Sequence, residues 1–321
     1  MLTLSMKRVY IFILTIALSA CQSASPLAPP TLPPMRVEQA SPVAGQQGAT
    51  NNGAVENGRP LAARVNSQPI FLDVYQQQVT QLEQALLAQG LDSSTPQGQA
   101  TLAQVQQQVL NALIDQVIIE QAANRLGITI TDDMLEARMQ ESIAQKPDQT
   151  QLEQWLAANN LTYEQFKQTV RSQLIANQVF EQITNDVPDT AEQVQIRQIV
   201  VADEDTARTI IEQIKNGADF AALAEQYSLD ESSRANGGSI DWFPQGLGLV
   251  PPEVEAAAFT LQPGQAQGPI QSPLGWHIIQ LQQRETNRPL GDKQPVLKQQ
   301  VFMKWLAEQR SLTTIEIYVG S

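Results

Sequence analysis

The spacing of apolar residues changes along the chain, and each change marks a different kind of segment. A continuous apolar run covers residues 9–20, whereas residues 22–60 show no apolar periodicity. From about residue 61 to 186, apolar side chains recur every three or four positions, which is typical of amphipathic helices. Residues of about 188–285 add alternating stretches that favour strands. The pattern predicts a leader, a linker, a helical domain and a mixed domain of helices and strands.

The helical domain is predicted to open with a short strand or turn over residues 62–70 and a helix over about 73–89. Thr95 and Pro96 then predict a helix start, because threonine caps a helix and proline fits its first turn. The following helix is apolar on more than one face near its end, so we expect it to be the buried central helix. Its apolar positions are Leu102, Val105, Val109, Leu113, Ile114, Val117, Ile118 and Ile119.

Capping residues predict two further helices. Gly127 is a typical C-terminal cap, and Thr131 begins the next helix with acidic residues in its first turn. Residues 162–165 form a capping box, in which threonine and glutamine each satisfy a free backbone N–H, so a helix is expected from there through Phe180.

The mixed domain is predicted to begin after Pro188, which ends the preceding helix. Alternating branched residues predict a strand over 194–201. The further elements expected are a helix over about 204–216, a short helix within 218–228, a strand over 239–243, a turn at 261–265 and a closing hairpin of 268–272 and 275–281. A last helix after Asp292 and a strand over 313–319 follow.

The leader resembles a bacterial lipoprotein signal. Lys7 and Arg8 precede the apolar run, which is shorter than the roughly 20 residues of a membrane span. The run ends in Leu18-Ser19-Ala20-Cys21, which implies cleavage before Cys21 and lipid on its sulfur. The alternative is an ordinary secretory signal with a chance cysteine. Residues 21–60, first rich in proline and then in glycine, predict a disordered tether.

Composition excludes several classes of function. Cleavage before Cys21 removes two basic residues and leaves 18 basic against 33 acidic side chains, a formal charge of −15. Such a chain is a poor partner for nucleic acid, whose phosphates need clustered Lys and Arg. One cysteine and one histidine allow neither an intrachain disulfide nor a zinc site of Cys and His ligands.

Several stretches of the mixed domain resemble the parvulin, or PpiC-type, peptidyl-prolyl isomerases. Residues 218–228, 249–259, 261–265 and 275–279 match the family's pattern in the family's order. The resemblance covers residues 188–285 and implies a four-stranded antiparallel sheet surrounded by helices, within an α+β chain. It also implies peptidyl-prolyl cis-trans isomerase activity without a metal or other cofactor.

The helical domain resembles the N-terminal domain of SurA-like and PrsA-like extracytoplasmic chaperones. The matching residues are 113–116, Ala122 and 126–132. The resemblance implies that residues 61–186 form a chaperone domain and that residues 290–321 pack back onto it. The alternatives are a generic helical bundle and a tail that only extends the isomerase block.

The parvulin resemblance assigns two groups of site residues. A slot for the proline ring would consist of Ile240, Leu249, Val254 and Phe259. The polar residues beside the substrate would be Asp230, Ser272, His277 and Gln198. Gln198 stands where the family usually has a second histidine, and glutamine both donates and accepts hydrogen bonds. A Gln198–His277–Ser272 network is therefore expected, with less preorganisation than a histidine pair provides.

Each polar residue also has a purely structural interpretation. Asp230 could be a solvated turn residue, Ser272 a serine at a strand end and His277 a histidine that only orders the sheet. The resulting prediction is a weak, lipid-anchored isomerase and foldase of the bacterial cell envelope, acting on unfolded or proline-containing polypeptides. The alternative is a holdase chaperone that binds such chains without catalysis.

Overall fold

The computed structural model describes residues 54–144, 149–158 and 161–319. Its contacts divide these residues into two compact units. The helical unit comprises the described residues up to Ala176 and those from Leu312 onward, and the sheet unit runs from Asn177 to Ser311. Among the described helices, none combines the length and hydropathy that a membrane span requires. The leader, Cys21 and most of the predicted tether lie outside the described residues.

A small antiparallel sheet opens the helical unit. Its strands are β1 (Val55–Glu56), β2 (Arg59–Val65), β3 (Gln68–Phe71) and β8 (Ile315–Ile317), and β2 pairs with each of the other three. The sequence predicts only a short strand or turn here, and β1 begins within the segment predicted as tether. The difference arises because β8 supplies pairing from the far end of the chain, with Ala63 opposite Ile317.

Five helices follow among the described residues, and the starts of α2, α3 and α5 agree with the predicted capping residues. They are α1 (Leu72–Ala88), α2 (Pro96–Arg125), α3 (Asp132–Ala144), α4 (Gln149–Ala158) and α5 (Tyr163–Thr184). The side chain of Thr95 accepts a hydrogen bond from the Gly98 N–H at 3.0 Å, which confirms the predicted cap. Thr162 and Gln165 exchange the two hydrogen bonds of the capping box. The predicted central helix is buried at its apolar end, where Ile114 is 0% exposed.

Removing the Thr95 cap is expected to destabilise the helical unit by about 1 kcal/mol, since one N–H in the first turn of α2 loses its partner. Urea denaturation of Thr95→Ala, followed by circular dichroism, measures this. Thr101→Ala is the matched control in the same helix, where Thr101 bonds to the Gln97 carbonyl and alanine has the higher helix propensity. Equal loss of stability in both variants would contradict the capping role.

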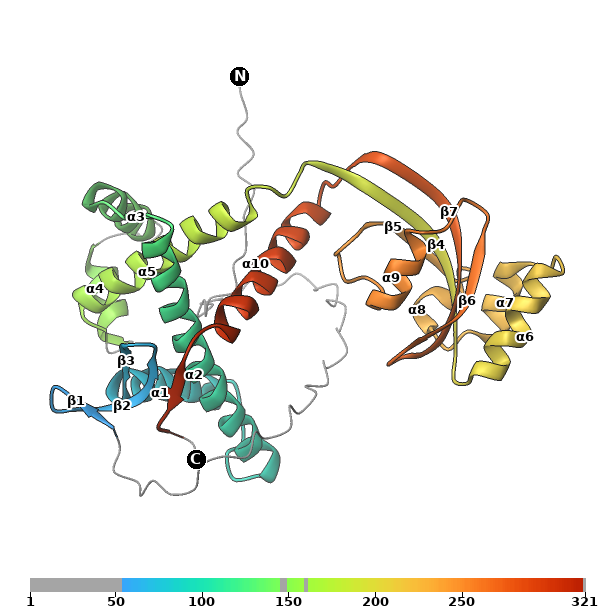
Figure 1. The fold of residues 1–321 in the computed structure, drawn as a ribbon. Helices are drawn as coiled ribbons and strands as arrows, with labels where there is room; N and C mark the ends of the chain where they lie inside the picture. The colour runs from blue at the N-terminus through green and yellow to red at the C-terminus, as the bar shows by residue number, and fades with distance from the viewer. Residues whose placement is uncertain (1–53, 145–148, 159–160, 320–321) are drawn as a thin grey trace. The chain divides into compact units, whose positions relative to one another are not determined.

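The sheet unit has a four-stranded antiparallel sheet, as the parvulin resemblance implies, and its strand order is β5-β4-β7-β6 (Figure 1). The strands are β4 (Thr190–Val201), β5 (Ser239–Pro244), β6 (Ala266–Ser272) and β7 (Gly275–Pro289). The helices are α6 (Glu204–Lys215), α7 (Phe220–Tyr227), α8 (Glu231–Arg234), α9 (Pro252–Ala258) and α10 (Lys293–Ser311). On α10, Phe302 stacks against Phe180 of α5 with ring centroids 5.2 Å apart.

Helices cover both faces of this sheet (Figure 1). On one face, Ile199, Val201 and Ile278 pack against α6 and α7. On the other, Val194, Ile196, Ile279 and Leu281 pack against α9 through Val254 and Ala258. Because side chains alternate along a strand, Gln198 and Val200 share this second face with Val194 and Ile196.

Strands β4 and β7 extend beyond the four-stranded part as a two-stranded ribbon. The sequence predicts strands of 194–201 and 275–281, whereas pairing continues to Thr190 opposite Pro289. Residues 282–289 are mostly polar and carry no strand pattern of their own, so their conformation comes from pairing with β4. The hydrogen bond from Leu290 N–H to the Asp189 carbonyl, at 2.9 Å, closes the ribbon.

Candidate functional site

Asp230 lies at the N-cap of the short helix α8, where several donors converge on its carboxylate. Ser232 donates to Oδ1 at 2.6 Å, and Ser233 donates to Oδ2 at 2.5 Å. Gln198 Nε2 also donates to Oδ2, at 2.7 Å. The buried Ser228 hydroxyl accepts from the N–H groups of both Val200 and Asp230, at 3.2 Å each. These bonds fasten the loop that carries Asp230 to the end of β4.

His277 lies in the middle of the sheet and pairs with Ser272 across the β6–β7 hairpin. The Ser272 hydroxyl and His277 Nε2 are 2.7 Å apart, and His277 is 1% exposed. The same hydroxyl accepts from the Leu274 N–H at 3.0 Å. The hairpin thus fixes both the serine rotamer and the imidazole ring.

The predicted Gln198–His277–Ser272 network divides into two hydrogen-bonded pairs, Gln198–Asp230 and His277–Ser272. Their residues share one face, since Val200 pairs with His277 in the strand register and Gln198 lies two residues before it. Gln198 Oε1 and His277 Nδ1 are both buried without a partner among the described residues. An Nδ1–H tautomer of His277 would complement the Gln198 carbonyl oxygen. We call Gln198, Asp230, Ser272 and His277 the polar cluster.

Burial and hydrogen bonding set the charge of the polar cluster. Desolvation raises the pKa of Asp230, but hydrogen bonds from Ser232, Ser233 and Gln198 outweigh it, so this pKa lies below its ordinary value. Burial lowers the pKa of His277, against the attraction of the Asp230 and Glu253 carboxylates. At neutral pH the cluster therefore holds an aspartate anion and a neutral imidazole.

The lowered pKa of His277 predicts a loss of stability in mild acid. The unfolded chain binds a proton at this residue near pH 6.5, whereas the folded chain binds it only at lower pH. The free energy of unfolding should therefore fall as pH decreases from about 7 to 5. The hydrogen bonds to ionised Asp230 contribute to the free energy of unfolding above the ordinary pKa of an aspartate, and this contribution is lost only as pH falls below about 4.

Urea denaturation across this pH range tests whether His277 causes the loss of stability. His277→Gln should give a free energy of unfolding with a smaller slope between about pH 7 and 5, because the titrating group is gone. The Asp203→Asn variant serves as the control: hydrogen bonds from Thr206 lower the pKa of Asp203, so its difference from the original chain should change mainly below about pH 4. An unchanged slope in His277→Gln would contradict the role of His277.

Gly238 brings a backbone loop against Gln198. Its φ is +76°, and a Cβ there would lie 2.2 Å from the Gln198 carbonyl oxygen. The Gln198 N–H donates to the Gly238 carbonyl at 2.8 Å. The consecutive glycines Gly237 and Gly238 are the sequence signal for this close approach.

The four predicted slot residues occupy different environments. Val254 is 0% exposed within the core beside Ile196, and Ile240 packs partly buried against the same core. Leu249 is 52% exposed on the loop before α9. Phe259 packs edge-on against Phe243, with ring centroids 6.0 Å apart. Leu249 is therefore the most exposed residue of this group.

Two exposed leucines beside the polar cluster are not identified by sequence reasoning. Leu229 is 58% exposed and immediately precedes Asp230, and its N–H donates to the Val200 carbonyl at 2.7 Å. Leu274 is 62% exposed in the hairpin that carries Ser272. Exposed leucines on the two segments that carry cluster residues provide apolar contact surface next to polar groups.

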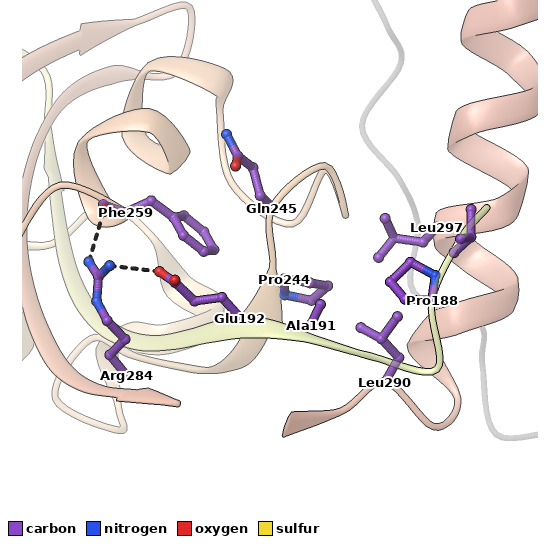
Figure 2. Close-up of a pocket in the computed structure, with 10 residues that line it drawn as sticks. Pro188, Ala191, Glu192, Pro244, Gln245, Phe259, Arg284, Leu290 and Leu297 are labelled. Carbon is purple, nitrogen blue, oxygen red and sulfur yellow. Dashed lines mark hydrogen bonds and ion pairs between the residues drawn. The ribbon is translucent and has the colours of Figure 1, made fainter. Parts of the chain in front are cut away.

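An open cavity of about 530 Å³ lies at the base of the β4–β7 ribbon (Figure 2). Phe259 is the one predicted site residue in its wall, and most of the wall is apolar. The lining residues are Val187, Pro188, Ala191, Glu192, Pro244, Gln245, Phe259, Arg284, Leu290 and Leu297. No local sequence motif marks this set, because it combines four separate segments of the sheet unit.

Arg284 connects the ribbon to the end of α9 at this cavity (Figure 2). Its Nη1 donates to Glu192 Oε1 at 2.6 Å. Its Nη2 donates to the carbonyls of Phe259 and Leu261, each at 2.8 Å. One guanidinium thus satisfies carbonyls at the C-terminal end of α9 and fixes Phe259 relative to the sheet.

Family models match both parts of the chain. Residues 184–283 match the PPIC-type PPIASE domain, and residues 40–180 match the SurA-like N-terminal domain. These matches overlap the two segments for which the sequence alone shows a parvulin and a SurA-like resemblance.

Relatives that match over half or more of this chain carry the name foldase. Foldase protein PrsA of Caldanaerobacter subterraneus subsp. tengcongensis is 30% identical over 226 residues, which are 68% of this chain and 72% of that protein. Foldase protein PrsA 2 of Bacillus anthracis is 34% identical over 164 residues, which are 50% of this chain and 56% of that protein. A crystal structure of the peptidylprolyl isomerase PrsA from Bacillus anthracis is 28% identical, with a TM-score of 0.46, and covers 63% of this chain and 93% of that chain.

Proposed function

The chain belongs to the PrsA foldase family, and from this membership and the geometry of the sheet unit we propose that it catalyses prolyl cis-trans isomerisation in unfolded polypeptides outside the cytoplasm. The domain that carries the activity is of the parvulin type. The observation that supports the proposal most directly is the polar cluster, which lies on one sheet face with the exposed leucines Leu229 and Leu274 on its flanking segments.

The reaction makes modest chemical demands. Rotation about a peptide bond crosses a barrier of about 18–20 kcal/mol that arises from amide resonance. No covalent bond forms or breaks, so the site needs neither a nucleophile nor a strong acid or base. It accelerates the reaction by binding the twisted amide more tightly than the planar one.

The polar cluster is suited to this task through hydrogen bonding rather than proton transfer. The Asp230 anion lies beside Gln198 and would face the substrate carbonyl region, where charge changes as the amide twists. His277 and Ser272 would order the floor of the slot. Leu249 and Ile240 would contact the proline ring, backed by the buried Val254 and by Phe259.

Gln198 makes a weak isomerase the expected result. A glutamine side chain has more rotatable bonds than histidine, and its Oε1 atom and His277 Nδ1 have no hydrogen-bond partner in the part of the chain that the structure describes. Part of the binding free energy in the transition state is then lost to ordering the site. A protease-coupled assay of a short Leu-Pro peptide measures the rate, and no acceleration over buffer by a folded sample would overturn the proposal.

A second function, peptide holding without catalysis, is favoured by one observation: Val254 is fully buried and Leu249 is half exposed, so the slot is shallow. Deleting residues 190–289, whose ends meet at the Leu290–Asp189 hydrogen bond, distinguishes the two. If suppression of client aggregation persists and prolyl turnover disappears, both activities exist in separate units. If aggregation suppression also disappears while the helical unit stays folded, the holding activity resides in the sheet unit.

We further propose that lipid on Cys21 anchors the mature chain to a membrane of the cell envelope. The Leu18-Ser19-Ala20-Cys21 sequence supports this, since cysteine follows small residues at the end of a short apolar run. Mass spectrometry of the purified N-terminal peptide should show a diacylglyceryl thioether on Cys21. An unmodified Cys21 in protein isolated from its native membrane would rule out the anchor.

A further inference from the structure

We propose that the cavity at the base of the β4–β7 ribbon binds a large apolar side chain of the same extended polypeptide whose proline occupies the isomerase site. The cavity would act as a second contact point for the client chain. The position of the proline rests on the proposed function, whereas the cavity itself is a feature of the structure.

The cavity and the polar cluster lie at opposite ends of the same sheet face. Glu192 of the cavity wall accepts a hydrogen bond from Arg284, and Gln198 of the cluster lies on the face of β4 that carries Val194 and Ile196. On β7, Arg284 pairs opposite Val194, and His277 pairs opposite Val200. Six residues of strand separate the two positions, which corresponds to about 20 Å.

The cavity wall favours an apolar group without charge. Pro188, Pro244, Phe259, Leu290 and Leu297 supply apolar surface around it. The charged groups in the wall, Glu192 and Arg284, form an ion pair 2.6 Å apart and so largely offset one another. A volume of about 530 Å³ falls within the range of small-ligand pockets and accommodates a phenylalanine or leucine side chain.

One loop connects the cavity to the predicted proline slot. Pro244 and Gln245 line the cavity, and Leu249 of the slot follows a few residues later in the chain. Gly246 and Gly248 have φ values of +82° and +73°, so this loop turns where side chains would be strained. Phe259 is shared, since it lines the cavity and closes the core behind α9.

Because the cavity and the proline slot are connected along one sheet face, we expect both to bind the same client chain. A client segment that places its proline beside the polar cluster and continues along the sheet face in an extended conformation reaches the cavity after about six residues. The exposed amide of Gln245, at the cavity in Figure 2, can donate to or accept from its backbone. The two contacts then act on one chain, so the second binds at a raised effective concentration.

The test uses fluorescent peptides of polar background with one Leu-Pro and one phenylalanine, placed two, four, six or eight residues before or after the proline. Anisotropy with the full mature chain measures each dissociation constant. We expect the peptide with a spacing of about six residues on one side to bind about tenfold more tightly than the same peptide with serine for phenylalanine. The other spacings should bind like the serine peptide.

Two variants assign the gain to the cavity. Ala191→Phe fills it, and Leu297→Ser makes its wall polar; both should remove the gain and leave binding of the serine peptide unchanged. Ala218→Phe is the matched control, because Ala218 is exposed between α6 and α7, beside the opposite sheet face. A gain that is independent of spacing, or that survives in both cavity variants, overturns the proposal.

Two further outcomes separate this proposal from the isomerase function and from other occupants. Prolyl turnover of the same peptides without any spacing dependence leaves the isomerase function standing and removes the cavity site. If binding depends on spacing but no prolyl turnover is found, the cavity site stands and the isomerase function is removed. If Ala191→Phe changes the sedimentation coefficient instead of peptide affinity, the cavity belongs to an interface between two copies, and the proposal fails.

Discussion

Replacing Gln198 by histidine is expected to raise kcat/KM for a short Leu-Pro peptide about tenfold, which corresponds to about 1.4 kcal/mol of transition-state stabilisation. Imidazole has fewer rotatable bonds than the glutamine side chain, so less conformational entropy is lost when the substrate binds. Its ring nitrogens can reach toward Asp230 and His277, and in the original chain Nδ1 of His277 has no partner among the residues that the structure describes. The protease-coupled assay measures the gain directly.

Gln195→His provides the matched control for this gain. Gln195 is on the same strand, but an odd number of residues away, so its side chain projects to the opposite face. It should leave kcat/KM unchanged. A folded Gln198→His variant with unchanged or lower kcat/KM would indicate that the polar cluster does not form the catalytic surface, and the holding function would then be preferred.

Replacing Arg284 by methionine is expected to lower the free energy of unfolding of the sheet unit by about 2–4 kcal/mol. Methionine keeps much of the apolar stem but removes every donor. The carbonyls of Phe259 and Leu261 and the Glu192 carboxylate then lose charge-assisted hydrogen bonds. Partial exposure of the pair, 23% for Arg284 and 39% for Glu192, keeps the loss below that of a fully buried ion pair.

Urea denaturation monitored by tryptophan fluorescence tests this expectation, with Arg208→Met as the control. Arg208 pairs with Glu204 on the surface of α6, and such exposed pairs contribute about 0.5 kcal/mol or less. Glu192→Gln combined with Arg284→Met should lose less than the sum of the single variants, because they share an interaction. Equal free energies of unfolding for Arg284→Met and Arg208→Met would contradict the structural role of Arg284.

The features that the sequence predicts correctly are those set by local chemistry. Thr95 and Thr162 identify helix starts because their hydroxyl groups bond within the next turn. The four-stranded antiparallel sheet is implied by the parvulin resemblance, and the alternation of branched residues predicts strand β4. Helix α4 and the extension of α5 to Thr184 have weaker local signals and are defined by the structure.

Nonlocal pairing accounts for what the sequence leaves undetermined. Gln198 and Asp230 are separated by 32 positions, and their hydrogen bond depends on how Ser228 and Gly238 fasten two loops to β4. The polar residues 282–289 form a strand only because β4 lies beside them. The assignment of the domains and the roles of the site residues remain predictions, for which the variants above provide the tests.

The hydrogen bond between Leu290 and Asp189 also has a mechanical consequence. It places the two connections of the four-stranded sheet side by side at the tip of the ribbon. Tension applied through these two connections would pull β4 and β7 apart at the tip of the ribbon. The hydrogen bonds between the two strands would then open one after another, from Thr190 and Pro289 inward. Such peeling needs less force than shearing all bonds at once, so under load the ribbon should yield before the four-stranded region that holds His277.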